Sequence, residues 1–141
     1  MDAIIFLGAG VSQVALLEQF KIMGVCTVAI DINASAPGFA ISDYQVLAST
    51  HDPAESIKGL LELKTKIEVE YKGVLNRSNA LPTITAARIA DYFNLPCHSV
   101  EAAQIALDKK RTISFLGALG VPVPRQLALS EVLAMSGKFP I

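Results

Sequence analysis

Residues 3–13 read Ala3-Ile4-Ile5-Phe6-Leu7-Gly8-Ala9-Gly10-Val11-Ser12-Gln13, an apolar run of strand length that stops at a glycine. An uninterrupted apolar run is typical of a strand that is buried on both faces, as in parallel sheets. Apolar residues then recur at helical spacing from Leu16 to Met23, and Gly24 stands where helices commonly end. This opening strand and helix therefore predict a parallel sheet that is covered by helices.

Residues 25–107 repeat the alternation of strands and helices. Apolar runs at 25–30, 44–48 and 73–75 predict three further strands. Helical patterns follow Asp52, Pro82 and Ser99, of which Asp52 and Ser99 are typical capping residues. In the helix after Asp52, the expected buried face consists of Ile57, Leu60 and Leu61. The pattern predicts an α/β fold with an open, Rossmann-like parallel sheet.

The last part of the chain has a different pattern. Asp108 is a cap candidate for a helix that Gly120 ends. Residues 126–129 are compatible with a strand and 130–136 with a short helix. Phe139-Pro140-Ile141 looks like the beginning of a further strand, at which the chain stops. A strand that is cut at its start suggests a fragment of a longer protein.

Composition excludes several classes of protein. Of the 141 residues, 52% are hydrophobic and the net charge is −1, so the chain is neither disordered nor basic enough for a nucleic-acid binder. No apolar run is long enough for a membrane span, and Asp2 stands where a secretory signal would carry positive charge. Cys26 and Cys97 lie in apolar stretches and are expected to be buried, reduced thiols. We therefore expect a cytoplasmic protein.

Ligands of such sheets bind beyond the carboxyl ends of the strands, where the first candidate loop is Gly8-Ala9-Gly10-Val11-Ser12-Gln13. It carries the first two glycines of the dinucleotide-binding fingerprint but has Gln13 at the place of the third. Free N–H groups at the start of a helix favour a phosphate, a carboxylate or a sugar. The alternative is a tight turn that binds no ligand.

Two further loops follow the predicted strands. Asp31 lies about 20 residues after Gly10, which is the offset of a ribose-binding acid, but it could equally stabilise a turn. Asn76-Arg77-Ser78 offers an amide, a guanidinium and a hydroxyl, which suit an anion or a carboxylate. Alternatively, this loop is solvated and Ser78 or Asn79 caps the next helix.

Lys109, Lys110 and Arg111 place three cations in the first turn of a predicted helix, where they oppose its dipole. A bound phosphate would compensate this charge, and so would Asp108, Glu101 or solvent. The sequence has no Ser/His/Asp, Cys/His or paired-carboxylate arrangement and no cluster of metal ligands. It therefore shows no catalytic residue and no metal site of its own.

Taken in order, these segments resemble the N-terminal part of ATP-grasp ligases. No single segment is specific, but the ordered set covers the whole chain. The segments that carry the resemblance are Gly8-Ala9-Gly10 with Gln13, Val28-Ala29-Ile30-Asp31, Ala36-Pro37-Gly38, Ser42-Asp43, Gly73-Val74-Leu75, Ala86-Ala87-Arg88-Ile89-Ala90, Asn94-Leu95-Pro96, Ser99-Val100-Glu101-Ala102-Ala103, Asp108-Lys109-Lys110 and Gly120-Val121-Pro122-Val123-Pro124-Arg125.

The resemblance implies a reaction. Enzymes of this family, which includes biotin carboxylase and carbamoyl-phosphate synthase, use ATP and Mg²⁺ to join a carboxylate or bicarbonate to an amine or ammonia through an acylphosphate. The resemblance assigns Lys109 to the ATP phosphates, and the loops 8–13 and 76–78 to the substrate side of the cleft. With Asp31, the candidate substrate-binding residues are Gly8, Gly10, Gln13, Asp31, Asn76, Arg77 and Ser78.

The resemblance also implies two domains, a pre-ATP-grasp domain at 1–107 and the truncated start of the ATP-grasp domain at 108–141. A second ATP lysine, the Mg²⁺ ligands and a catalytic arginine would follow residue 141. The fragment should therefore be inactive alone. A homodimer is compatible with this assignment. One alternative is an NAD(P)-dependent oxidoreductase in which Asp31 holds the ribose, although Gln13 argues against it. The other is a nucleotide-binding module without catalytic function.

Overall fold

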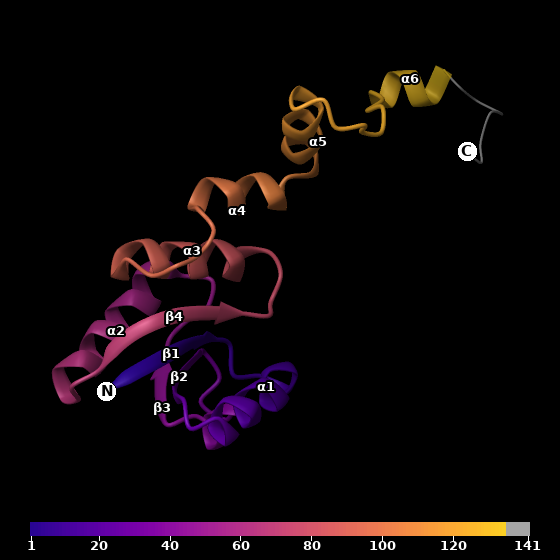
Figure 1. Ribbon diagram of the computed structural model, residues 1–141. Coiled ribbons are helices and arrows are strands. Elements are labelled where there is room, and N and C mark those ends of the chain that lie inside the picture. Colours follow the sequence, from indigo (N-terminus) through magenta and orange to yellow (C-terminus); the bar gives the residue numbers. More distant parts are fainter. Residues whose placement is uncertain (135–141) are drawn as a thin grey trace. The chain divides into compact units, whose positions relative to one another are not determined.

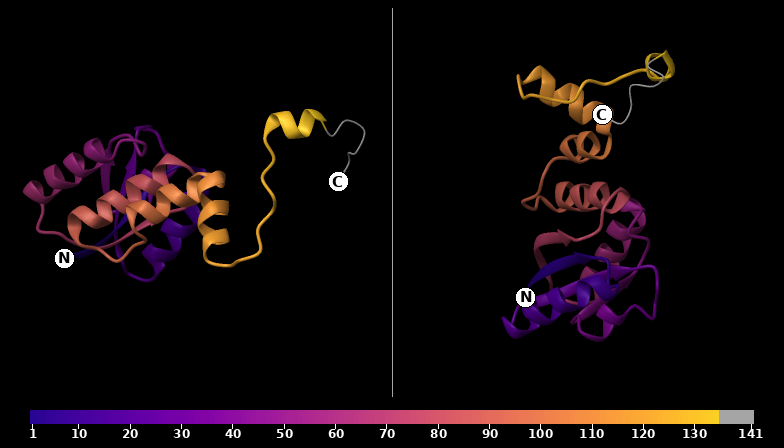
Figure 2. Two further views of the ribbon diagram at one scale, coloured as in Figure 1. Left: turned by 90° about the horizontal axis from the view of Figure 1, so that it is seen from above. Right: turned by 90° about the vertical axis from the view of Figure 1, so that its right-hand side faces the viewer.

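The computed structural model describes residues 1–134 (Figures 1 and 2). The chain divides into two compact units, Met1–Leu107 and Asp108–Ile141. Each unit has its own set of elements and is described by itself.

The first unit is built on a four-stranded parallel sheet with the strand order β3-β2-β1-β4. The inner strand β1 (Asp2–Leu7) lies between β2 (Cys26–Asp31) and β4 (Glu70–Asn76), and β3 (Tyr44–Leu47) forms one edge. Since all four strands run in the same direction, their carboxyl ends share one edge of the sheet. The predicted α/β class with an open parallel sheet is confirmed.

Helices cover both faces of this sheet (Figure 1). One face carries α1 (Val11–Ile22) and the short 3₁₀ helix η1 (Pro37–Ala40), and the other carries α2 (Pro53–Lys66) and α3 (Leu81–Phe93). The last helix of the unit, α4 (Val100–Leu107), packs against α3. None of the helices in the described part of the chain is long and apolar enough to cross a lipid bilayer.

Alternate residues of β1 enter two separate cores. Ile5 and Leu7 pack with Leu60 on the face covered by α2 and α3. Phe6 packs with Leu17 on the opposite face and makes an edge-to-face contact with Phe20 at 5.0 Å between ring centroids. Since both sets of side chains are buried, β1 needs an uninterrupted apolar sequence, which explains why this run predicted the fold.

Two predicted helix caps are confirmed. The Asp52 carboxylate accepts hydrogen bonds from the backbone N–H groups of Ala54 and Glu55 at the start of α2. The Ser99 hydroxyl oxygen accepts one from the N–H of Ala102 at the start of α4. Each bond pairs an N–H group that the helix itself leaves without an acceptor.

The second unit contains α5 (Lys109–Ala118) and α6 (Leu129–Ala134) within its described residues. No side chain of either helix is buried. The predicted strand at 126–129 is wrong: residues 126–128 have no regular structure, and α6 begins at Leu129. A strand requires a partner strand, which the described residues of this unit do not supply. The expected strand at 139–141, like residues 135–136 of the expected helix, lies outside the described residues.

Two side chains that were expected to be buried are exposed. Leu61 follows the fully buried Leu60 on α2, and adjacent helical residues point in directions about 100° apart. Cys97 lies in the loop between α3 and α4 and is exposed, whereas Cys26 is half-buried; both thiols are free. An apolar sequence context does not bury a residue when the segment runs over the surface.

Candidate functional site

The carboxyl edge of the sheet brings the three predicted loops of the first unit together. Leu7, the last residue of β1, pairs with Ile30 on one side and with Asn76 on the other. Gly8 therefore follows β1 between Asp31, which ends β2, and the loop that begins at Asn76. The strand order also reverses its direction at β1, which is where open parallel sheets bind ligands.

The side chain of Gln13 lies against the glycine loop between β1 and α1. Gly8 has a φ of +104°, and a Cβ atom at this position would lie 3.0 Å from Nε2 of Gln13. A Cβ at Gly10 would lie 3.5 Å from Oε1 of the same side chain. The backbone conformation therefore requires glycine at position 8, and Gln13 lies directly beside it. Gln13 occupies the space that the third glycine of a dinucleotide-binding loop leaves open.

Gln13 is buried, but its amide donor is not used. Only 5% of the residue is exposed. Its Oε1 accepts a 2.7 Å hydrogen bond from the Ser12 hydroxyl, while Nε2 donates none to any residue that the structure describes. No fully buried side-chain N or O atom in the described part of the chain lacks a partner, so this Nε2 must reach the surface. It is a hydrogen-bond donor available to a ligand at the start of α1.

Asp31 holds the glycine loop in place. One carboxylate oxygen accepts a 2.8 Å hydrogen bond from the N–H of Ala9, and the other accepts a 2.9 Å bond from the N–H of Asn33. Both oxygens are therefore engaged by the backbone. Of the two interpretations that the sequence left open for Asp31, this geometry favours the turn over the ribose contact.

Arg77 connects the loop after β4 with the start of α1. Its Nη1 donates a 2.6 Å hydrogen bond to the carbonyl oxygen of Ser12, across 65 residues of sequence. A guanidinium carries five N–H donors, so this bond leaves the others available. Arg77 is exposed, and its positive charge is held beside the residue that precedes Gln13.

Asn76 and Ser78 form a closed turn. The Asn76 amide nitrogen donates to the carbonyl oxygen of Ser78 at 2.8 Å, and its amide oxygen accepts from the N–H of Ser78 at 2.9 Å. Thr83, in the first turn of α3, adds a hydroxyl contact to each of these residues. Two of the three candidate residues in this loop therefore position the backbone, and Arg77 is the one that reaches toward α1.

The alternative interpretation of this loop, in which Ser78 or Asn79 caps α3, is wrong. The N-cap is Ala80, which has a φ of 64° and a ψ of −134° and supplies no side-chain hydrogen bond. An alanine rarely adopts this conformation, which costs on the order of 1–3 kcal/mol. The sequence contains no signal for Ala80, and the only signal for Thr83 is a hydroxyl residue that follows a polar loop.

Lys109 belongs to the second unit. It is the first residue of α5 and is exposed. Asp108 caps this helix through hydrogen bonds from the N–H groups of Lys110 and Arg111 at 2.9 and 3.1 Å. Of the partners that the sequence suggested for this cationic turn, the structure therefore supplies Asp108. Its carboxylate offsets the unfavourable interaction between the three cations and the helix dipole.

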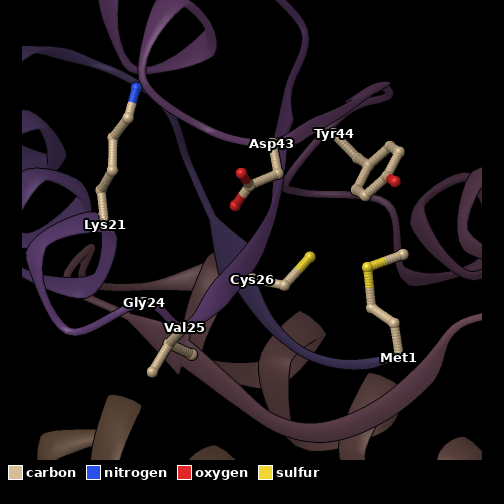
Figure 3. Close-up of a pocket in the computed structure, with 7 residues that line it drawn as sticks. All are labelled: Met1, Lys21, Gly24, Val25, Cys26, Asp43 and Tyr44. Atoms are coloured by element: carbon tan, nitrogen blue, oxygen red, sulfur yellow. The ribbon is translucent and has the colours of Figure 1, made fainter.

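One cavity of the first unit, of about 240 Å³, lies at the opposite edge of the sheet (Figure 3). Asp43 lines it, but its Oδ2 accepts hydrogen bonds from the N–H and the hydroxyl of Thr27, so the carboxylate joins β2 to the start of β3. Burial and the nearby Asp43 charge raise the pKa of the Cys26 thiol in the same cavity. The hydrogen bonds between Asp43 and Thr27 thus stabilise the amino edge of the sheet.

No group of three or more His, Cys, Asp or Glu side chains within residues 1–134 could hold a metal ion.

No protein-family model and no curated protein matches the sequence. Solved structures do match the fold. The phosphoribosylglycinamide synthetase from Anaerococcus prevotii is similar over 89% of this chain and 31% of its own, with a TM-score of 0.74 and 24% identity. This is the pre-ATP-grasp fold.

Two further structures with this pre-ATP-grasp fold are informative. An L-amino acid ligase from Bacillus licheniformis is 18% identical with a TM-score of 0.63, over 87% of this chain and 31% of its own. The N5-carboxyaminoimidazole synthetase from Staphylococcus aureus, solved in complex with ADP, is 18% identical with a TM-score of 0.59, over 95% of this chain and 34% of its own. This chain therefore spans about a third of the length of each of these three ATP-grasp enzymes.

Proposed function

We propose that this chain is the substrate-side domain of an ATP-dependent ligase, followed by the start of its ATP-binding domain. The parent enzyme would activate a carboxylate or bicarbonate as an acylphosphate for attack by an amine or ammonia. The observation that carries this proposal is the unused amide donor of the buried Gln13, at the start of α1 and one residue from the Arg77 contact. The neighbouring folds of a synthetase and a ligase support it.

The chemistry of the loop suits a carboxylate or phosphate group of a substrate. Such a group has only acceptor atoms, whereas Gln13 Nε2, Arg77 and the first N–H groups of α1 are all donors. The positive end of the helix dipole adds a favourable field for an anion. Gly8 allows the backbone to approach the ligand closely. The domain would thus bind and orient the substrate, which increases the rate of ligation by positioning.

The ATP phosphates would be held by Lys109. A lysine ammonium binds phosphate oxygens as a point charge, and the capped first turn of α5 presents it together with Lys110 and Arg111. When bound, ATP and Mg²⁺ supply the phosphoryl group of the acylphosphate. The described residues offer no cluster of carboxylates for Mg²⁺, so we assign its ligands to the rest of the parent protein. We place the parent enzyme in the cytoplasm.

The NAD(P)-dependent oxidoreductase is less well supported. The pyrophosphate of NAD(P) would need the space over the glycine loop that Gln13 fills. The ribose would need a free carboxylate, but both oxygens of Asp31 already accept hydrogen bonds from backbone N–H groups. A nucleotide-binding module without catalytic function would have the same fold as the proposed ligase, so only a measurement of ligase activity distinguishes the two.

The proposal is tested on the full-length parent protein with ATP·Mg²⁺, hydroxylamine and a panel of small carboxylates. Hydroxylamine converts an acylphosphate into a hydroxamate, which a colour reaction with iron detects. We expect hydroxamate and ADP to form in equal amounts with the cognate carboxylate. Nucleotide binding with neither hydroxamate from any carboxylate nor ADP formation in the presence of bicarbonate would favour the non-catalytic module, and saturable NADH binding without an ATP response would favour the oxidoreductase.

The role of individual residues is tested with matched variants of the same protein. Gln13→Glu keeps the size of the side chain but presents a negative charge to the substrate, and Arg77→Ala removes the guanidinium. Each should raise the KM for the carboxylate by about tenfold or more, because a hydrogen bond to a charged group contributes ~1.5–3 kcal/mol. Lys109→Ala should raise the KM for ATP instead. Equal effects of all three variants on both substrates would contradict the assignment.

A further inference from the structure

A thiol and an imidazole face each other in the loop between α3 and α4. Cys97 Sγ lies 3.4 Å from Nδ1 of His98, and both side chains are exposed. On the other side of the ring, Nε2 of His98 lies 3.4 Å from the carbonyl oxygen of Thr83. The imidazole is thus held between a thiol and a backbone carbonyl of the preceding helix.

This arrangement selects one tautomer of the ring. The Thr83 carbonyl can only accept, so Nε2 must carry the hydrogen of that bond. In the neutral ring, Nδ1 is then an acceptor and points to the Cys97 thiol. Transfer of the thiol proton to Nδ1 would give a thiolate beside an imidazolium. A base that accepts the proton of a nucleophile and is oriented by a third group is the arrangement of activated thiols.

The pair opens onto a cavity of about 290 Å³ between α3 and the start of α4. Asp91, in the last turn of α3, is the other ionisable side chain that lines it. The remaining walls are short side chains and Leu95, so there is room beside Cys97 for a small attached group.

We propose that Cys97 is a site of reversible thiol modification by low-molecular-weight disulfides, with His98 as the base. His98 Nδ1 takes the thiol proton, and the thiolate attacks one sulfur of the disulfide. A bond forms between Cys97 Sγ and that sulfur, the disulfide bond breaks, and the second sulfur leaves as a thiolate that takes up the proton. The disulfide is the oxidant, and a free thiol reverses the step.

The modification would act close to the candidate substrate loop. Thr83, whose carbonyl holds the His98 ring, also contacts Asn76 and Ser78 through its hydroxyl. The modification site itself does not depend on the proposed ligase function, and its test measures thiol chemistry alone.

The test uses the full chain with Cys26→Ser, which leaves Cys97 as the only thiol. The reagent is dithiodipyridine, an uncharged aromatic disulfide, so that the Asp91 charge does not repel it. The measured quantity is the second-order rate constant of thione release at several pH values between 6 and 9. His98→Gln keeps a side-chain donor toward Thr83 but has no ring nitrogen to accept the thiol proton, and His51→Gln is the matched control.

We expect His98→Gln to slow the reaction of Cys97 by about tenfold or more at neutral pH, with a smaller effect at pH 9, where hydroxide removes the thiol proton. His51→Gln should leave the rate unchanged. If His98→Gln reacts as fast as its parent at every pH, the proposal is wrong. A second measurement needs no substitution at His98: the folded chain should react faster at neutral pH than the same chain unfolded in urea, and an equal or lower rate would overturn the proposal.

Discussion

Asp31 shows what one carboxylate can do at the end of a parallel strand. Its two oxygens bind the N–H groups of Ala9 and Asn33, which lie in loops after two different strands. The side chain thereby fixes the glycine loop against β2, and Gln13 packs onto that fixed loop. At this scale, the candidate site is preorganised by a residue that does not itself need to touch a ligand.

We predict that Asp31→Asn lowers the free energy of unfolding by about 1–3 kcal/mol. An amide has one acceptor and one donor group, so in either orientation one backbone N–H loses its acceptor. Urea unfolding followed by circular dichroism measures the change. Asp91→Asn, at an exposed position, should stay within about 0.5 kcal/mol of the parent. Equal losses in the two variants would show that the Asp31 contacts contribute nothing.

Single residues also show what the sequence could and could not predict. Asp52, Ser99 and Asp108 were recognised as caps because capping depends on neighbours within three positions along the chain. Cys97 was expected to be buried because its neighbours in sequence are apolar, yet burial depends on which elements pack over a segment. The sequence shows Gln13 only as a departure from the dinucleotide-binding fingerprint. It does not predict the contact of Gln13 with Gly8, because the spacing of residues does not determine the direction of a side chain.

Among the elements, α2 approaches β3 so closely that a glycine is needed at the contact. A Cβ atom at Gly59 would overlap Cγ1 of Val46, which lies on β3 and is buried. Helices normally avoid glycine in their interior, where it costs about 1 kcal/mol relative to alanine. The close approach of the helix to the sheet explains why α2 tolerates this cost.

We predict strong coupling between these two positions. Gly59→Ala alone should destabilise the protein by about 1–3 kcal/mol through overpacking, and Val46→Ala alone by a similar amount through lost burial. In the double variant, the new methyl group occupies space that Val46 has vacated, and the helix gains the propensity of alanine. The four proteins form a double-mutant cycle in urea unfolding. Losses that simply add would contradict the proposed overlap.

The contact between β4 and α2 predicts a dependence of stability on pH. The Tyr71 hydroxyl donates a buried 2.8 Å hydrogen bond to the carbonyl of Leu60, and burial raises the pKa of Tyr71 to about 12. In the unfolded chain a tyrosine loses its proton near pH 10. The free energy of unfolding should therefore be constant with respect to this group below pH 10, and should fall between about pH 10 and 12.

The measurement compares the parent with Tyr71→Phe in urea unfolding from pH 8 to 11.5. At pH 8 the variant should be less stable by about 1 kcal/mol, because it lacks the hydrogen bond. The difference should shrink above pH 10, since the variant has no phenol to titrate at this position. Tyr92→Phe, whose ring is exposed, is the control and should follow the parent curve. A Tyr71→Phe curve parallel to the parent would contradict the prediction.

The elements also show where prediction from sequence fails. Strands β1 to β4 were predicted because each is an apolar run whose partners lie in the same unit. The expected strand at 126–129 was an apolar run of the same kind, and it has no partner among the described residues of its unit. Strand formation is a property of a pair of segments, so one segment cannot specify it.

For the whole molecule, the buried core belongs entirely to the first unit. Every buried hydrophobic residue of the described chain lies at or before Ala103. The helices of the second unit expose Phe115 and Leu133 and bury no side chain. Since burial of apolar surface is the main favourable term in folding, the first unit has what it needs for independent stability.

We therefore predict that residues 1–107, expressed alone, unfold cooperatively with the same urea midpoint as residues 1–141. The free energies of unfolding should agree within about 0.5 kcal/mol, apart from the error of extrapolation. The control is a chain of residues 1–93, which lacks α4 and the buried Ala103 that it contributes, and which should be less stable. A large loss of stability on removal of residues 108–141 would disprove this independence.

The position of β1 has a consequence for how the protein is made. This strand precedes the rest of its sheet along the chain, yet one of its two partners, β4, is synthesised about seventy residues later. Until then, an apolar strand has one unpaired edge and one uncovered face, which is a state prone to aggregation. Nascent chains that are stalled before β4 should accordingly bind a chaperone that recognises exposed apolar segments, and should release it once β4 can pair with β1.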